Sequence, residues 1–304
     1  MLETILLLIL GIAITWTGAE IIIWTSKRLS LKFGISIVVI SLTVVAAGTS
    51  LPEASVSWIA SFKKVSNLAL GNVIGSCIIN IGMVLGIGAM ILPLNVEKEI
   101  IKFDYPVLLL SSLIFFFTSL NGIISRAESF LYLFFFLLYI FSLSKRKRIP
   151  KKENGNLPSL PILFLFLIFG FILLFIGGKI TVIEAVIFAK LLKIDELIIG
   201  VTVVAFGTSI PELAVVVLGG IRGVPELSIG TIVGSNIVNI LLILGGSALI
   251  NPVKNYSNFF IQSPSVLFFT AILFPLFITG RKLSRFKGFL LFTFYVIYSY
   301  LILK

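Results

Sequence analysis

The octet Ala46–Glu53, AAGTSLPE, interrupts a long apolar run between the strings ISLTVV and ASVSWIA. Nearly the same octet returns at Ala205–Glu212 as AFGTSIPE. A proline inside a helix removes a backbone donor and breaks the helix, and a carboxylate in hydrocarbon costs roughly 2.5–3.5 kcal/mol on insertion scales. A sequence that repeats so unfavourable an octet is expected to use it, and both octets are therefore candidates for a functional site.

The composition around the octets is that of a membrane protein. Of 304 residues, 58% are hydrophobic and 12% are charged, whereas soluble domains carry about 25% charged residues. Apolar runs long enough to cross a bilayer occur ten times. They are residues 4–26, 34–62, 66–92, 104–120, 123–143, 160–189, 197–219, 227–250, 262–280 and 286–303. The sequence therefore predicts an all-α membrane protein with ten transmembrane helices.

The chain contains an internal duplication. A shift of 159 residues places Thr43–Gly86 on Thr202–Gly245 without a gap, with 20 identities in 44 positions. Five predicted spans separate equivalent points, and an odd number reverses the direction of crossing. This pattern is typical of the inverted repeats of secondary transporters, whose sites lie near the midplane between broken helices. We expect two inverted five-helix repeats, residues 1–143 and 160–304, with ion-site motifs at 43–86 and 202–245.

The remaining segment, residues 144–159, is a short basic linker punctuated by Pro150 and Pro158. The net charge of +11 could suggest a nucleic-acid partner, but basic loops that set membrane topology explain it better. With ten spans, 16 of the 24 Lys and Arg residues fall on the side of the linker and 8 on the other. The prediction is a multi-pass protein of the cell membrane with a cytoplasmic linker and both termini extracellular.

The choice of metal ligands is restricted. The chain has one cysteine, Cys77, and no histidine, so a thiolate or imidazole site for zinc, copper or iron is not expected. Oxygen ligands remain, and these suit hard cations such as Ca²⁺. No Lys or Arg lies within nine residues of Glu53 or Glu212. A local salt bridge therefore does not explain these carboxylates, which leaves protonation or a bound cation.

Other oxygen-bearing side chains surround the two glutamates in the sequence. A single Ser or Thr in a membrane helix usually bonds back to its own helix, but here they recur in matched sets beside both glutamates. The sets are Thr49, Ser50, Ser76 and Asn80 in one copy and Thr208, Ser209, Ser235 and Asn239 in the other. Their glycines, Gly71, Gly75, Gly230 and Gly234, are expected to allow close helix approach or a second helix break. The two carboxylates can neutralise one Ca²⁺ or two Na⁺.

A further acidic residue does not follow the repeat. Glu20 aligns with Lys179 under the same shift, so its charge is not preserved between the copies. Glu184 has the same status as Glu20. We interpret both as charges near the membrane interface rather than as ion ligands.

At the two octets and at the strings GNVIGSCIINIG and GTIVGSNIVNI, the chain resembles the sodium/calcium exchanger branch of the cation/calcium exchanger superfamily. The resemblance implies a ten-helix antiporter that exchanges Na⁺ for Ca²⁺ by alternating access. It implies that Glu53, Glu212, Thr49 and Thr208 bind Ca²⁺. For Na⁺ it implies the same glutamates with Ser50, Ser76, Ser209, Ser235 and the backbone carbonyls of Ala46 and Ala205. Asn80 and Asn239 would complete the centre of the site, directly or through water.

One position departs from the pattern of several relatives, which have Asp where this chain has Asn239. The change removes a third possible negative charge and argues against K⁺ dependence. Three alternatives stay open: a Ca²⁺/H⁺ or broader cation antiporter, a cation channel, and a structural or signalling membrane protein. No enzymatic activity, cofactor, nucleic acid or protein partner is expected; the predicted partners are Na⁺, Ca²⁺ and the lipid bilayer.

Overall fold

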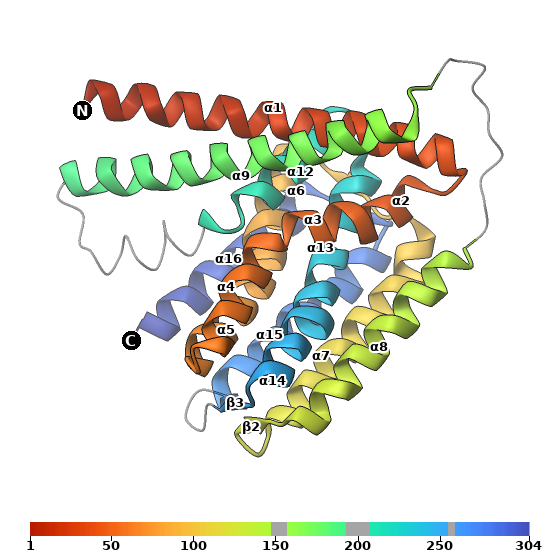
Figure 1. Cartoon of the computed structure of the whole chain (residues 1–304), viewed down its shortest axis with the longest axis vertical. Coiled ribbons are helices and arrows are strands. Elements are labelled where there is room, and N and C mark those ends of the chain that lie inside the picture. Colours follow the sequence, from red (N-terminus) through yellow and green to blue (C-terminus); the bar gives the residue numbers. More distant parts are fainter. Residues whose placement is uncertain (147–156, 193–206, 255–258, 304) are drawn as a thin grey trace.

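The computed structural model describes residues 1–146, 157–192, 207–254 and 259–303 (Figure 1). Its elements up to the linker are α1 (Leu2–Phe33), α2 (Ile37–Ile40), η1 (Ser41–Val45), α3 (Ala46–Thr49), α4 (Leu51–Phe62), α5 (Ser66–Ile79), η2 (Asn80–Val84), α6 (Leu85–Ile91), β1 (Leu94–Asn95), η3 (Ile100–Asp104), α7 (Tyr105–Ser119), β2 (Ile123–Ile124) and α8 (Arg126–Ser144). Elements marked η are π-helical turns. The chain is almost entirely helical in this part, as predicted.

After the linker the described elements are α9 (Leu160–Leu191), α12 (Ile210–Ile221), α13 (Pro225–Ile237), η5 (Val238–Leu244), α14 (Gly245–Ile250), β3 (Val253–Lys254), α15 (Phe259–Ile278), β4 (Lys282–Leu283) and α16 (Arg285–Leu303). Seven helical units of the described chain are long and apolar enough to cross a membrane, and the bent unit Ile37–Phe62 makes an eighth. Two shorter apolar helices, Ile210–Ile221 and Gln262–Ile278, accompany them. The chain is a multi-pass membrane protein.

The two longest helices, α1 and α9, lie side by side along one side of the molecule (Figure 1). Glycines bring their backbones together: a Cβ atom placed on Gly18 would lie 2.6 Å from the Leu174 nitrogen, and one on Gly177 would lie 2.4 Å from the Thr15 nitrogen. Small residues at helix contacts are the usual means of close packing in membranes. The pair runs obliquely to the remaining bundle, which contains most of the buried residues.

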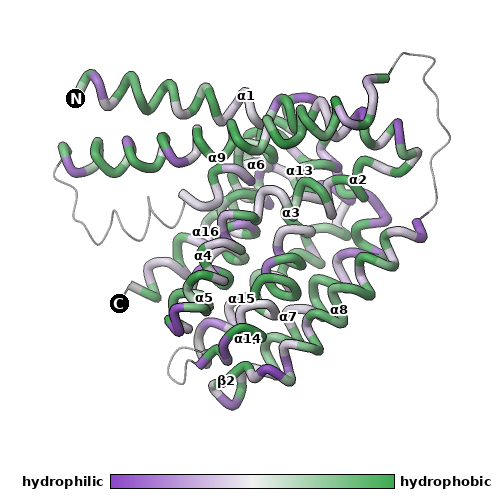
Figure 2. Tube along the Cα trace, viewed as in Figure 1, coloured by the Kyte–Doolittle hydropathy of each residue, from purple (hydrophilic) through white to green (hydrophobic). Residues whose placement is uncertain are grey.

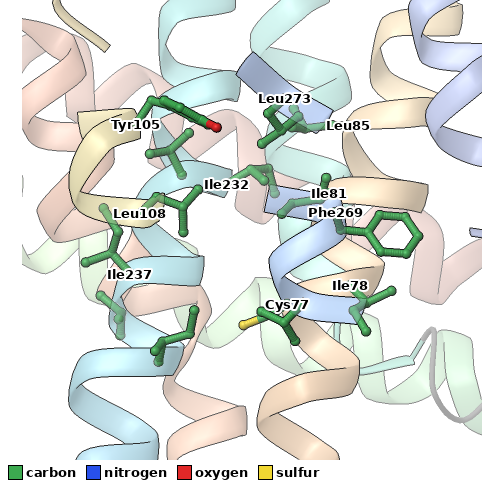
Figure 3. Packing of buried hydrophobic residues seen from close by; sticks show 14 of the residues in the cluster. Cys77, Ile78, Ile81, Leu85, Tyr105, Leu108, Ile232, Ile237, Phe269 and Leu273 are labelled. Carbon is green, nitrogen blue, oxygen red and sulfur yellow. The ribbon is translucent and has the colours of Figure 1, made fainter. Parts of the chain in front are cut away.

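The remaining helices form a bundle around an apolar core. Figure 3 shows Cys77, Ile81 and Leu85 facing Ile232 and Ile237, with side chains of α7 and α15 closing the cluster. Figure 2 shows apolar residues along most of the helices and hydrophilic residues gathered mainly where helices end, as around β2. The interior is close-packed by helices from both sides of the linker, and this packing fixes the position of the polar residues described below.

Two antiparallel pairs of two-residue strands join the connections between helices. β1 pairs with β4 in the register Leu94 with Leu283, and β2 pairs with β3 in the register Ile124 with Val253. These strands are not predicted from the sequence, because two residues are too few to show a periodicity. The 159-residue shift places β1 on β3 and β2 on β4, so each pair joins one strand from each side of the linker.

Candidate ion-binding site

Both octets break their helix at the same point. α3 ends at Thr49, Ser50 adopts φ −85° and ψ 6°, and α4 starts at Leu51 with a bend of 49°. In the second octet Ser209 adopts φ −97° and ψ 7° ahead of α12. The prolines that follow, Pro52 and Pro211, lie in the first turn of the new helix, where a missing amide hydrogen is tolerated. The predicted breaks are confirmed at both octets.

The break places Glu53 and Glu212 in the first turn of α4 and α12, where the positive end of the helix dipole stabilises an acidic side chain. Each side chain is only 1% exposed, and the two carboxylates are close enough to interact electrostatically. Ser76 donates a hydrogen bond to Glu53 Oε1 at 3.4 Å. Within the described chain, Glu53 Oε2 and both carboxylate oxygens of Glu212 have no hydrogen-bond partner. Buried oxygens in this condition are costly unless a ligand or a proton satisfies them.

Hydroxyls from both sides of the linker meet at the first octet. The Thr49 hydroxyl lies 3.4 Å from the Ser235 hydroxyl, and both donate to the Ala46 carbonyl, at 3.3 and 3.4 Å. Thr49 also faces the Glu212 carboxylate, without forming a hydrogen bond to it. The predicted ligands Thr49, Ser235 and Ala46 therefore share one buried cluster with the glutamates.

Close packing of glycines against the first octet region makes this meeting possible. A Cβ atom on Gly230 would lie 2.0 Å from Ser41 Oγ, and one on Gly234 would lie 2.7 Å from the Leu42 carbonyl oxygen. The predicted close approach is confirmed for these two glycines. At Gly71 and Gly75 an added Cβ would meet no atom of the described chain within 4 Å, so the prediction of close approach is not met there.

Three asparagines and Cys77 lie together in the buried interior next to the octets. Asn80 donates to Asn236 Oδ1 at 3.1 Å, and Asn236 donates to the Cys77 carbonyl at 3.0 Å. Asn239 lies beside the Cys77 thiol, and its own amide atoms have no hydrogen-bond partner in the described chain. Asn80 and Asn239 each lie at or beside the start of a π-helical turn, η2 and η5, an irregularity that is frequent at functional sites.

The other predicted residues are placed less uniformly. The hydroxyls of Ser50 and Ser209 are buried and without hydrogen-bond partners in the described chain. Thr208 is partly exposed and lines a cleft of about 390 Å³ between α9 and the two breaks. The lining residues of the cleft are Pro52, Phe175, Gly178, Lys179, Val182, Ile183, Gly207, Thr208 and Pro211. Ala205 lies outside the described residues.

Two polar residues beside the site were not predicted from the sequence. Asn236 links Asn80 to the Cys77 backbone, and Asn72 donates to the Glu53 carbonyl at 3.0 Å and to Ser57 Oγ at 2.8 Å. The 159-residue shift places Asn236 on Cys77 and Asn72 on Thr231. A search for residues identical in both copies discards such positions. A search for any amide inside an uncharged apolar run would have found them.

Comparisons with known proteins agree with this architecture. The sequence pattern of the family described as sodium/calcium exchanger protein matches residues 3–145 and 162–304. The chain is 32% identical over 336 residues to the sodium/calcium exchanger MaX1 of Methanosarcina acetivorans, covering 96% of each chain. It is 34% identical over 295 residues to an uncharacterized membrane protein, MJ0091, of Methanocaldococcus jannaschii, covering 95% of this chain and 94% of that one.

The fold is likewise similar to solved structures. The sodium-calcium exchanger NCX_Mj, soaked with 10 mM Na⁺ and 10 mM Sr²⁺, superposes with a TM-score of 0.83 at 32% identity, covering 97% of this chain and 96% of that chain. The same exchanger soaked with zero Na⁺ and Ca²⁺ gives a TM-score of 0.84. Because the family pattern matches two long stretches and these relatives are similar over nearly the full length, the chain belongs to the sodium/calcium exchanger protein family.

Proposed function

We propose that the protein is a secondary antiporter that exchanges Na⁺ for Ca²⁺ by alternating access at the buried site of the two octets. The observation that carries the proposal is the pair Glu53 and Glu212: two buried carboxylates, close to each other, whose oxygens are mostly without hydrogen-bond donors. Two such charges repel each other when both are ionised. One divalent cation or two monovalent cations remove the repulsion and satisfy the oxygens.

The ligand chemistry fits these cargo ions. Ca²⁺ takes six to eight oxygen ligands, supplied by carboxylates, carbonyls and water. We assign Ca²⁺ to Glu53, Glu212, Thr49 and Thr208. Na⁺ would use the same glutamates with Ser50, Ser76, Ser209, Ser235 and the carbonyls of Ala46 and Ala205, while Asn80 and Asn239 complete the centre directly or through water. Because both ions need the same carboxylates, binding of one excludes the other, which is the condition for exchange.

For the membrane architecture we propose ten spans in two inverted five-helix repeats, residues 1–143 and 160–304. The ten spans are the seven long helical units, the bent unit Ile37–Phe62, and the units that contain Ile210–Ile221 and Gln262–Ile278. Three observations support the repeat. The octets break at equivalent serines, equivalent strands pair crosswise, and the family pattern matches once on each side of the linker.

The orientation follows from the basic residues. The linker 144–159 is placed in the cytoplasm and both termini outside the cell, because most Lys and Arg residues fall on the linker side of the ten proposed spans and basic loops stay cytoplasmic. The partly exposed Thr208 and its cleft then belong to the extracellular side. With the linker in the cytoplasm and the cleft outside the cell, the ion site of this exchanger opens to the extracellular side.

The test is uptake of radioactive Ca²⁺ into proteoliposomes loaded with Na⁺. An outward Na⁺ gradient should drive Ca²⁺ accumulation, and collapse of the gradient with a Na⁺ ionophore should abolish it. If an outward-directed H⁺ gradient drives Ca²⁺ accumulation equally well with no Na⁺ on either side, the protein is a Ca²⁺/H⁺ antiporter instead. If Ca²⁺ does not accumulate and its flux only follows the Ca²⁺ gradient, the protein is a channel instead.

A further inference from the structure

Residues of α1 hold the end of α12. Glu20 accepts hydrogen bonds from the Arg222 guanidinium, one of them from Nε at 2.7 Å, and the two residues form an ion pair. Lys27 donates to the Arg222 carbonyl at 3.4 Å. Arg222 directly follows α12, the helix that begins with the second octet and carries Glu212. These contacts therefore tie α1 to the helix that carries half of the ion site, at the linker end of the bundle.

The equivalent positions in the other copy cannot form such a pair. The 159-residue shift places Glu20 on Lys179 and Arg222 on Lys63. Lys63 follows α4 with φ −80° and ψ 2°, almost the backbone conformation of Arg222, φ −82° and ψ 8°. The backbone is thus matched, but the opposite charges of one copy become two like charges in the other. Lys179 instead lines the cleft beside Thr208.

The packing of the two long helices shows the same asymmetry. On α1, Ile22, Ile23 and Leu29 are 0–2% exposed. Their equivalents on α9 are Thr181, Val182 and Phe188, all partly exposed. α1 packs along α12, whereas α9 makes no comparable contact with α4 in the described chain.

The asymmetry reaches the ion site itself. Thr49 is fully buried, whereas its equivalent Thr208 is partly exposed in the cleft. In a transporter built from inverted repeats, an element that is packed on one copy and open on the other marks the side that is closed. The linker end is the closed side here, and the end with the cleft is the open side.

We propose that the Glu20–Arg222 pair is a latch that closes the linker side of the ion site, and that Lys63 and Lys179 disfavour the exchanged arrangement. In that arrangement α9 would pack along α4 as α1 now packs along α12, which would bring the two lysines together. The inference rests on the inverted repeat of the proposed function. It assigns a preferred conformation to the protein: closed at the linker side and open at the opposite side.

The expected size of the bias is modest. The Arg222 side chain is 54% exposed and that of Glu20 is 28% exposed, and exposed ion pairs contribute little because water and salt screen them. Loss of the pair should change the ratio of the two conformations by about two- to fivefold. Removal of the lysine repulsion should produce a change of similar size in the same direction.

The experiment measures the conformational ratio directly, without ion flux. Spin labels at Ile59 and Ile187, exposed residues of α4 and α9, report the distance across the open side in a Cys77→Ala background. Glu20→Gln should increase the population with the short distance about two- to fivefold. Lys179→Glu should also increase it, because the introduced carboxylate would attract Lys63. The charge exchange Glu20→Arg with Arg222→Glu should return the ratio toward that of the parent protein.

A matched control is Glu3→Gln, which removes an exposed charge from the same helix and should leave the ratio unchanged. An unchanged ratio in Glu20→Gln and Lys179→Glu overturns the latch, as does failure of the charge exchange to restore it. These outcomes are separate from the proposed function. A shifted ratio in a protein that shows no Na⁺-driven Ca²⁺ uptake supports the latch and contradicts the exchanger, and the reverse combination contradicts the latch alone.

Discussion

The hydroxyl of Thr49 lies 3.4 Å from the hydroxyl of Ser235, although 186 residues separate them in the sequence. One comes from the first octet and the other from α13, and both turn toward the Ala46 carbonyl. The site is therefore assembled from both sides of the linker, and neither side contains it alone.

Removal of either hydroxyl should weaken ion binding. We expect Thr49→Val to raise the dissociation constant for Ca²⁺, and Ser235→Ala to raise that for Na⁺, each about tenfold, equivalent to about 1.4 kcal/mol, because a buried oxygen ligand is lost. Calorimetric titration of the purified protein measures the effect. Thr17→Val, on the exposed face of α1, should bind like the parent, and equal losses in all variants would contradict the assignment.

Asn236 should contribute to stability. It donates to the Cys77 carbonyl and accepts from Asn80, so Asn236→Leu leaves buried polar groups without these partners, at a cost of about 1–3 kcal/mol. The melting temperature in detergent should fall by about 3–8 °C. Asn67→Leu, at an exposed position of α5, is the control and should melt within about 1 °C of the parent. A similar melting temperature for both variants would show that the two hydrogen bonds of Asn236 contribute nothing to stability.

A second buried cluster lies at the linker end of α8. Asp104 is fully buried, accepts a hydrogen bond from the Tyr139 hydroxyl at 3.1 Å and forms an ion pair with Arg146. Arg146→Ala leaves a buried charge unpaired, which typically costs about 3–5 kcal/mol, so a strong loss of thermal stability is expected. Asp104→Asn combined with Arg146→Gln should be less harmful. Lys145→Ala is the neighbouring control; if it destabilises as much as Arg146→Ala, the ion pair is not the cause.

Glu97 should make stability depend on pH. It lies between two spans, and burial together with the charges of Glu226 and Glu99 raises its pKa above the ordinary value. A carboxyl whose pKa is raised on folding stabilises the fold when protonated and loses that contribution as pH rises through the folded pKa. Glu97→Gln should therefore raise the melting temperature at pH 8, by about 1–2 °C after solvent screening, and should have little effect at acid pH. The exposed Glu3→Gln should show no such difference between the two pH values.

The sequence predicted which polar residues lie together where the pattern is duplicated. The two octets and their serines and asparagines stand out because an expensive pattern occurs twice, and the structure brings Glu53, Glu212, Thr49 and Ser235 together. The breaks at Ser50 and Ser209 follow from the prolines two residues later. These features depend on local backbone chemistry and on identity between the copies, and both can be inferred from the amino-acid sequence.

The features it could not predict depend on packing between distant segments. The sequence predicts for Glu20 a charge near the membrane interface; the structure places it in an ion pair with Arg222, 202 residues away. No local sequence pattern indicates an ion-pair partner so distant in the sequence. Asn236 and Asn72 escaped for the opposite reason: their equivalents Cys77 and Thr231 differ, so the comparison of copies hid them. The π-helical turns and the strand pairs likewise arise from tertiary contacts.

The measurement that tests the central claim most directly is Na⁺-gradient-driven uptake of radioactive Ca²⁺ in proteoliposomes, for the parent protein and for Glu53→Gln. Gln keeps the shape of the side chain and removes one of the two buried charges, so the site can no longer neutralise Ca²⁺. The account predicts rapid uptake by the parent and a loss of at least about 100-fold in the variant, with normal folding and membrane insertion. Uptake by Glu53→Gln at the rate of the parent would contradict it.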